Sequence, residues 1–251
     1  MPTVSLSFPN HAYHLEYTML LSRSTIQERI LNRELRISVD VQGDLIGVDT
    51  LEQVDRHLQI RTAKLDLHLG SQYAFYTDAA VRPLAANTRT LEENQHAIVS
   101  PQDGIVFRTR EYLHMPRNLG GIVSSKIGFA TLGLSAVSAT VDPTFEGFLI
   151  ITVWNHGNDE IHLTSEDAIA TVSFFQLDTP VPEGVTVRSQ KGDLFECVWG
   201  SILKDYLHHG SAASLEEVLE EIRRDEGLEG KPYQQLYNTI SRRLDRKGSS
   251  M

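Results

Sequence analysis

The sequence predicts a mainly β protein, folded as a barrel or a jelly-roll-like sandwich. Short runs of β patterning recur at close spacing, separated by turns rich in Gly, Pro and Asp, which is typical of all-β barrels and sandwiches. Residues 120–177 add near-continuous β patterning that only polar, glycine-marked turns interrupt. A wound α/β sheet would alternate its strands with long helices. We therefore expect strands that close on themselves, which leaves few exposed edges.

Length and composition favour a cytoplasmic protein with a substantial core. A chain of 251 residues is long enough for one large or two small domains. Cys197 is the only cysteine, which excludes an internal disulfide and the Cys-x-x-Cys zinc site of base deaminases. We expect no membrane association, because no apolar run approaches the roughly 18 residues of a membrane helix and the first ten residues lack a signal-peptide pattern.

The net charge argues against nucleic acid as a partner. It is formally −10, whereas binding to DNA or RNA depends on many Lys and Arg contacts with phosphate. A small triphosphate is compatible with this charge, because a local cation cluster or a magnesium ion overcomes a distant acidic surface. The ten histidines form no His-Glu-x-x-His or Cys-His pattern, so we expect no metal site built by the protein alone.

The N-terminal part predicts an extension over residues 1–20, with a short edge strand, and then a helix. The pattern Ser24-Thr-Ile-Gln27 is a capping box, and the helix that it begins should extend to about residue 33. We expect Ile26, Ile30 and Leu31 on its buried face, since they recur at helical spacing.

The next segments alternate between strands and polar connections. Residues 35–41 alternate as a strand, and the polar residues 42–55 predict a loop or an irregular hairpin. Residues 60–76 hold the clearest alternation, Leu65, Leu67 and Leu69. After an irregular excursion over residues 77–94, three short strands are expected at residues 97–99, 104–108 and 111–114.

The pattern changes character after residue 177. Pro180, Pro182 and Gly184 interrupt the β alternation. A second capping box begins at Ser214, and two helices are predicted, the later one starting near Pro232. We therefore divide the chain into an extension (1–20), a β-barrel domain (21–185) and a C-terminal helical extension (186–251).

Two polar turns predict a ligand site in the barrel. Ser124-Ser125-Lys126 forms the first turn, with Gly128 close behind, and Asp142-Pro143 forms the second, closed by Gly147. Hydroxyl groups, a lysine and tight-turn amides are suited to a small anion such as phosphate. An aspartate before proline is also a common local device in which the carboxylate accepts backbone amides, and for Asp142 both interpretations stay open.

Several motifs, taken together, resemble the dCTP deaminase and dUTPase superfamily of trimeric, nucleotide-binding β-barrels. They are residues 18–22 (TMLLS) before a short helix, residues 64–71 (KLDLHLGS), residues 104–116 (GIVFRTREYLHMP) and the serine turn. The resemblance covers roughly residues 18–180. It implies a dUTPase-like barrel, a homotrimer with pockets between subunits, a deoxynucleoside triphosphate ligand, and Mg2+ bound through the phosphates. Asp66 matches the acidic position of the superfamily, although it could instead bond backbone amides at a turn.

The same resemblance assigns roles to individual residues. The phosphates are expected at the serine turn, the pyrimidine edge at a hairpin of residues 134–141, and the sugar against an aromatic ring. The implied nucleotide-binding residues are Ser124, Ser125, Lys126, Gly128, Ser135, Ser138 and Phe145. Asp142 is the implied catalytic residue, positioning the water that attacks phosphorus. The 18-residue interval from Ser124 to Asp142 matches dUTPases better than deaminases.

The chain also departs from the superfamily pattern. Val123 stands where an arginine is usual, and Thr152 stands at the glutamate that deaminases use as a base. Ala168 and Thr171 replace the usual residues of a later motif, and the glycine-rich arm of dUTPases is missing. Because Thr152 cannot replace the glutamate base of deaminases, and because the interval from Ser124 to Asp142 matches dUTPases, the first hypothesis is hydrolysis. The reaction would convert a deoxypyrimidine triphosphate to monophosphate and pyrophosphate.

Two alternatives remain beside hydrolysis. One is a catalytically silent homologue that binds nucleotide or a protein partner. The other is dCTP deamination with a relocated base, for which Glu146 and Glu166 are the candidates.

Overall fold

The hydrophobic alternation predicted from the sequence is reproduced by the strands of the computed structural model, which describes residues 19–75, 89–92, 95–185, 187, 190 and 194. These residues form the helices α1 (Arg23–Leu31), α2 (Leu51–His57) and α3 (Ile127–Ala130). The main sheet contains β1 (Arg36–Val41), β2 (Asp44–Val48), β3 (Leu65–Phe75), β4 (Arg89–Thr90), β6 (Gly104–His114), β7 (Leu119–Ser125), β8 (Leu134–Ala136), β9 (Ala139–Val141), β10 (Glu146–Asn155) and β12 (Ala168–Gln176). A second sheet pairs β5 (Ala97–Val99) with β11 (Ile161–Leu163). The prediction of a mainly β fold is confirmed.

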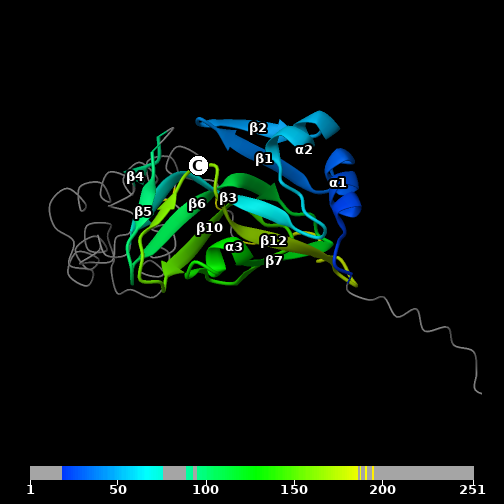
Figure 1. Ribbon diagram of the computed structural model, residues 1–251. Helices are drawn as coiled ribbons and strands as arrows, with labels where there is room; N and C mark the ends of the chain where they lie inside the picture. Colours follow the sequence, from blue (N-terminus) through cyan, green and yellow to red (C-terminus); the bar gives the residue numbers. More distant parts are fainter. Residues whose placement is uncertain are drawn as a thin grey trace, which may run out of the picture.

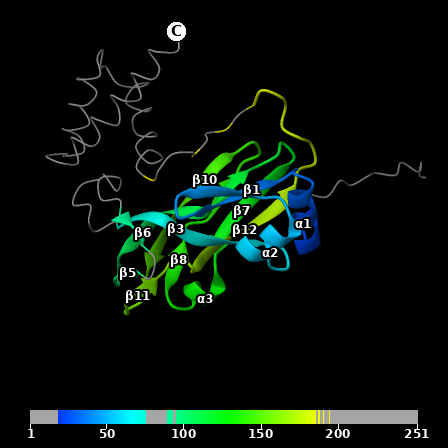
Figure 2. The same cartoon turned by 90° about the horizontal axis from the view of Figure 1, so that it is seen from above.

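The main sheet curls around a common core. Its path runs β2-β1-β6-β3-β12-β7-β9, and β10 pairs with both β6 and β8. In Figures 1 and 2, α1 and α2 lie at one end of the curled sheet and β5 lies at the other. The long antiparallel ladders therefore bring residues that are distant in sequence, such as those of β3, β12 and β7, side by side.

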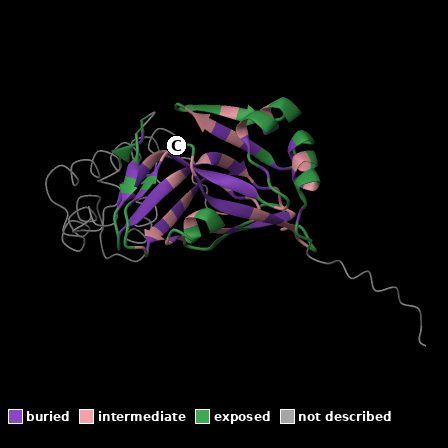
Figure 3. Ribbon diagram, viewed as in Figure 1, coloured by how far each residue is buried: buried purple, intermediate pink, exposed green. Residues whose placement is uncertain are grey.

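One face of each long strand fills the core. Leu65, Leu67 and Leu69 are fully buried, as the alternation predicts, and Phe107 and Phe174 are the largest side chains beside them. Figure 3 shows this buried colouring along the inner strands, with exposed residues on the helices and loops. At the end of β10, the amide of buried Asn155 donates to Val99 O and Asp159 O, both at 2.9 Å, and accepts from Gly157 N. This side chain joins β10 to β5 and to the following loop.

The start of the first helix differs from the prediction. Ser22, and not Ser24, is the N-cap of α1, and its hydroxyl accepts from Thr25 N at 3.3 Å. Ile26 and Ile30 are buried as expected, but Leu31 is 39% exposed. Ser22 is the cap because its backbone is extended and its hydroxyl is placed to accept from the free amide of Thr25.

Residues 42–55 are more regular than predicted. Gln42 and Gly43 both have positive φ, 55° and 95°, which produces the tight two-residue turn between β1 and β2. Thr50 and Gln53 then form a complete capping box for α2. The hairpin alternative of the prediction is therefore confirmed by the pairing of β1 with β2, whereas the helix was missed although its capping signal was present in the sequence.

Other predicted elements merge or pair differently. The separate strands expected at 104–108 and 111–114 are one continuous strand, β6. The hairpin expected at 134–141 is absent from the described structure, because β8 pairs with β10 and β9 pairs with β7. The predicted strand within residues 1–20 and the two C-terminal helices lie outside the described residues, and the domain boundaries stay a prediction.

Candidate functional site

The polar residues of the site form a row across three strands. Ser124 of β7 lies opposite Thr171 of β12, which lies opposite Asp66 of β3. Residues directly opposite each other in antiparallel strands share a face, so these three side chains project to the same side of the sheet. The Ser124 and Thr171 hydroxyl oxygens are 3.1 Å apart. The row brings together residues from three distant parts of the sequence.

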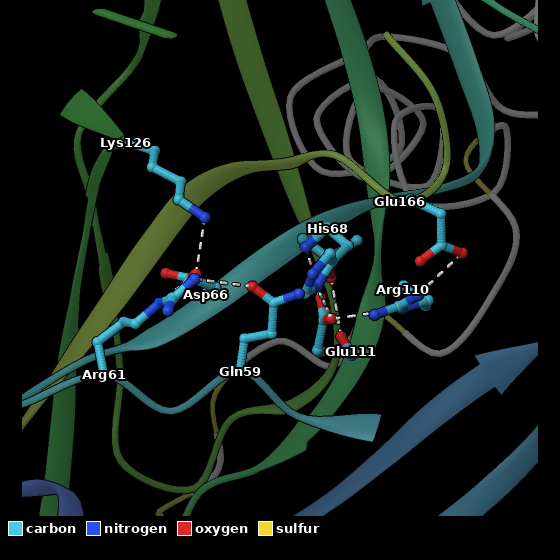
Figure 4. A network of polar contacts seen from close by, with 9 residues as sticks. Gln59, Arg61, Asp66, His68, Arg110, Glu111, Lys126 and Glu166 are labelled. Atoms are coloured by element: carbon cyan, nitrogen blue, oxygen red, sulfur yellow. Dashed lines mark hydrogen bonds and ion pairs between the residues drawn. The ribbon is translucent and has the colours of Figure 1, made fainter. Parts of the chain in front are cut away.

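The buried carboxylate of Asp66 holds two cations (Figure 4). One of its oxygens, Oδ2, accepts from Lys126 Nζ at 2.7 Å and from Arg61 Nε at 3.1 Å. Asp66 is only 1% exposed, whereas the Lys126 side chain is 28% and the Arg61 side chain 61% exposed. The expectation that Asp66 bonds backbone amides at a turn is wrong, because it lies within β3 and bonds two side chains.

Ser124 and Ser125 are the last two residues of β7 and not part of a turn. Consecutive strand residues point to opposite faces, so the two hydroxyls separate. Ser125 Oγ accepts from Ala136 N at 2.7 Å and thereby ties β7 to β8. Ser138 Oγ donates to Val123 O at 2.9 Å, and Ser135 Oγ lies 2.9 Å from His156 Nε2. These three serines therefore have partners within the chain.

The short helix α3 follows the serines directly. Lys126 is its N-cap residue, and Gly128 lies on it with open space where a Cβ would be. Ile127 is 78% exposed and Leu132 is 62% exposed. An apolar, open surface therefore borders the polar row.

Asp142 and Phe145 lie away from Ser124 within one chain. Val141 pairs with Gly121 while Ala139 pairs with Val123, so Asp142 is about four residues, or roughly 13 Å of strand, from the level of Ser124. Phe145 is only 8% exposed and packs in the core. Asp142 is exposed, and its carboxylate makes no hydrogen bond to the described residues. The local-turn interpretation, in which this carboxylate accepts backbone amides, does not describe this chain.

The positions that depart from the superfamily pattern lie in different parts of the fold. Val123 is 2% exposed and packs in the core. Thr152, on β10, accepts from Val137 N through its carbonyl at 2.9 Å. Thr171 contributes its hydroxyl to the row itself.

The two candidate relocated bases already have neighbours. Glu146 accepts from the Tyr112 hydroxyl at 3.0 Å. Burial, and then this hydrogen bond, raises the pKa of Tyr112 to about 12. The Glu166 side chain is 83% exposed and lies 3.7 Å from Arg110 Nη1. Each carboxylate therefore already has a polar neighbour within the chain.

Sequence reasoning missed a second polar cluster on β3. His68 and Glu111 are both fully buried, with Nδ1 and Oε1 2.7 Å apart, and Glu111 also accepts from His68 N at 2.9 Å. Figure 4 shows Arg110 on the far side of Glu111, reaching toward Glu166. The signal was available, because Asp66 and His68 alternate with the three leucines and so share the opposite face of β3.

Two further observations concern metals and membranes. Among the described residues, no three His, Cys, Asp or Glu side chains gather in a way that could hold a metal ion. In the same part of the chain, no helix has the length and apolar character needed to span a bilayer.

Comparison with known proteins identifies the family of the chain. The dCTP deaminase of Ignicoccus hospitalis is 26% identical over 150 residues, covering 57% of this chain and 82% of its own. The "dCTP deaminase, dUMP-forming" of Aquifex aeolicus is 29% identical over 178 residues, covering 69% and 90% respectively. The crystal structure of 2'-deoxycytidine 5'-triphosphate deaminase from Agrobacterium tumefaciens has a TM-score of 0.49 and 13% identity, and the match covers 79% of this chain and 56% of that one. The profile of the family described as dCTP deaminase-like matches residues 20–177, more than half of the chain, which therefore belongs to that family.

Proposed function

We propose that this protein binds a pyrimidine deoxynucleoside triphosphate with its phosphates over the row of Ser124, Thr171 and Asp66. The observation that carries the proposal is the pair of hydroxyls 3.1 Å apart with the Lys126 ammonium beside them. Hydroxyl and ammonium donors suit phosphate oxygens. The names of the relatives, which are dCTP deaminases, support dCTP or dUTP as the ligand and a place in nucleotide metabolism.

The base is proposed to lie toward residues 134–141, whereas Phe145 is buried in the core and is not assigned to the sugar. The resemblance assigns the pyrimidine edge to this segment, near Ser135 and Ser138. Its β8 strand adjoins the end of β7, since Ser125 bonds Ala136. Gly128 leaves open space on the α3 side.

The proposed site combines two copies of the chain. Asp142 is too far from Ser124 to act on the same phosphate from within one chain. A homotrimer with pockets between subunits would bring Asp142 of one copy to the row of another. The exposed Ile127 and Leu132 beside the row suit burial in such a contact.

For the reaction, we propose hydrolysis between the α and β phosphates, with Asp142 positioning the water. Its exposed carboxylate is free of partners among the described residues. Magnesium would be held by the phosphates themselves, since this ion commonly needs only one or two protein carboxylates, and it would withdraw charge from the reacting phosphorus.

Deamination of dCTP is the second candidate, and the names of the relatives favour it. The name of the Aquifex aeolicus protein joins deamination of dCTP to formation of dUMP, a conversion that also removes two phosphates. Thr152 cannot shuttle a proton at neutral pH, so deamination would require Glu146 or Glu166 to act instead.

The test is to incubate the protein with Mg2+ and either dCTP or dUTP while measuring ammonia and pyrophosphate together. Hydrolysis predicts pyrophosphate without ammonia, and loss of turnover by at least about a hundredfold in Asp142→Asn. Asp55→Asn, an exposed aspartate on α2, is the matched control and should retain full activity. Ammonia release from dCTP would overturn hydrolysis as the sole reaction and make Glu146→Gln and Glu166→Gln the next variants.

Binding is measured separately by calorimetry. Ser124→Ala should weaken dCTP or dUTP binding by about tenfold, the loss of one hydrogen bond to a charged group, whereas the exposed Ser100→Ala should not. Binding without any product would favour the catalytically silent homologue. Absence of binding to both nucleotides would reject the proposal.

A further inference from the structure

Arg61 and Lys126 are held at one point by the same carboxylate oxygen. Both donate to Asp66 Oδ2, at 3.1 and 2.7 Å, so their nitrogens cannot be farther apart than these two distances combined. Arg61 precedes β3, and Lys126 follows β7. The fold therefore places two cations, 65 positions apart in the printed sequence, next to each other.

The charges in this cluster do not cancel. One carboxylate faces two cations, which leaves one positive charge in a chain whose formal net charge is −10. Asp66 is almost fully buried, while Lys126 is 28% and Arg61 61% exposed. The negative charge is thus inside and the positive charges are at the surface, which favours an anion arriving from solvent.

The cluster lies next to the proposed phosphate site. Asp66 and Ser124 both flank Thr171 on the same face of the sheet. Beyond the cluster, Arg61 lines an open pocket of about 550 Å³ together with Thr62 and Arg23. A chain of phosphates that begins at Ser124 therefore has donors and room in the direction of Arg61.

We infer that Arg61 and Lys126 form a cation pair for the β and γ phosphates, with Asp66 as the residue that positions both. This inference rests on the proposed function, which places the phosphates over the row that begins at Ser124. It explains how the chain binds a triphosphate with Val123 where the superfamily carries an arginine. Val123 is 2% exposed, so the charge is supplied from positions 61 and 126 instead.

A purely structural role makes a different prediction. If both cations served only to neutralise buried Asp66, replacing either one would lower stability without changing the preference for triphosphate over monophosphate. Arg61 is too exposed for its ion pair alone to contribute much stability. The ratio of the two affinities therefore separates the two roles.

The experiment uses the full chain and calorimetry with three probes: dCTP, dCMP and inorganic tripolyphosphate. Arg61→Gln and Lys126→Gln should each weaken binding of dCTP and tripolyphosphate about tenfold and leave dCMP binding within about twofold. Arg56→Gln, which removes an equally exposed arginine paired with Glu52 on α2, is the matched control and should change none of the three. Thermal unfolding of each variant confirms that it is folded.

The outcomes test the cation pair and the proposed function separately. Unchanged dCTP and tripolyphosphate binding in Arg61→Gln overturns the inference and leaves nucleotide binding intact. Tripolyphosphate binding that depends on Arg61, when the unaltered protein binds neither dCTP here nor dUTP in the calorimetry of the proposed function, overturns the proposed function and upholds the cation pair. An unaltered protein that binds none of the probes overturns both.

Discussion

Glu111→Ala should be among the most destabilising single substitutions in the described barrel. Glu111 and His68 are fully buried, and the glutamate accepts two hydrogen bonds from that histidine, from Nδ1 at 2.7 Å and from the backbone N at 2.9 Å. Removing one partner of a buried pair leaves the other without compensation and costs about 3 to 5 kcal/mol. The His68 ring would then lose its remaining hydrogen bond, because its Nε2 has no hydrogen-bond partner among the described residues.

A double-mutant cycle in urea measures the effect. His68→Leu removes the ring and leaves the carboxylate unpaired, so it should cost a similar amount, whereas His68→Leu with Glu111→Ala removes both polar groups. The double variant should therefore be less destabilised than the sum of the singles by at least about 1 kcal/mol, although its backbone amide at position 68 still lacks an acceptor. Glu52→Ala, with a side chain 77% exposed, is the control and should stay within about 0.5 kcal/mol. A cost below about 1 kcal/mol for Glu111→Ala, or strict additivity, refutes this reasoning.

Three other substitutions test the fold. Gly70→Ala should cost about 1 to 3 kcal/mol in urea unfolding, because its Cβ would lie 2.3 Å from the backbone oxygen of Arg108; an unchanged urea midpoint would contradict this. Asn155→Ala should cost about 3 kcal/mol by the same measurement, since it strips partners from two carbonyls and one amide, and a loss under about 1 kcal/mol would speak against that role. The raised Tyr112 pKa of about 12 means that the unfolded chain loses this proton first, near pH 10. Stability should therefore fall between pH 10 and 12 by on the order of 1 kcal/mol more in the unaltered protein than in Tyr112→Phe, and parallel pH profiles would exclude this linkage.

Local alternation of hydrophobic residues predicts the strands of the barrel, because burial of one face of a strand requires that alternation. Leu65, Leu67 and Leu69 are fully buried, since a shift of one residue would turn all three to the other face. The wrong predictions concern features that burial of side chains does not determine. Whether Ser22 or Ser24 is the N-cap depends on a single hydrogen bond. The sequence alone, with two serines at this spacing, does not show which of them makes it.

The candidate site was predicted in its residues but not in its contacts. Ser124, Lys126 and Asp66 were each identified from local motifs, whereas their meeting depends on the register of β3, β12 and β7. Arg61 was not predicted as a site residue, because no local sequence pattern indicates that an arginine before a strand lies beside Lys126. Such a contact is a property of the sheet register, which short-range periodicity does not determine.

In the proposed site, phosphate recognition and chemistry depend on different features of the chain. The pairs Asp66–Thr171 and Thr171–Ser124 are set by the register of three strands, so the alignment of the row does not depend on which residue occupies position 123. A proton-transfer step tolerates fewer substitutions than phosphate binding, since it needs one ionisable group at one place. Thr152 does not supply such a group. In the proposal, phosphate binding is therefore assigned to Lys126 and Arg61, and Asp142, Glu146 and Glu166 are the candidate bases. Product analysis with Asp142→Asn therefore bears on the chemistry, and the affinity ratios in Arg61→Gln bear on recognition.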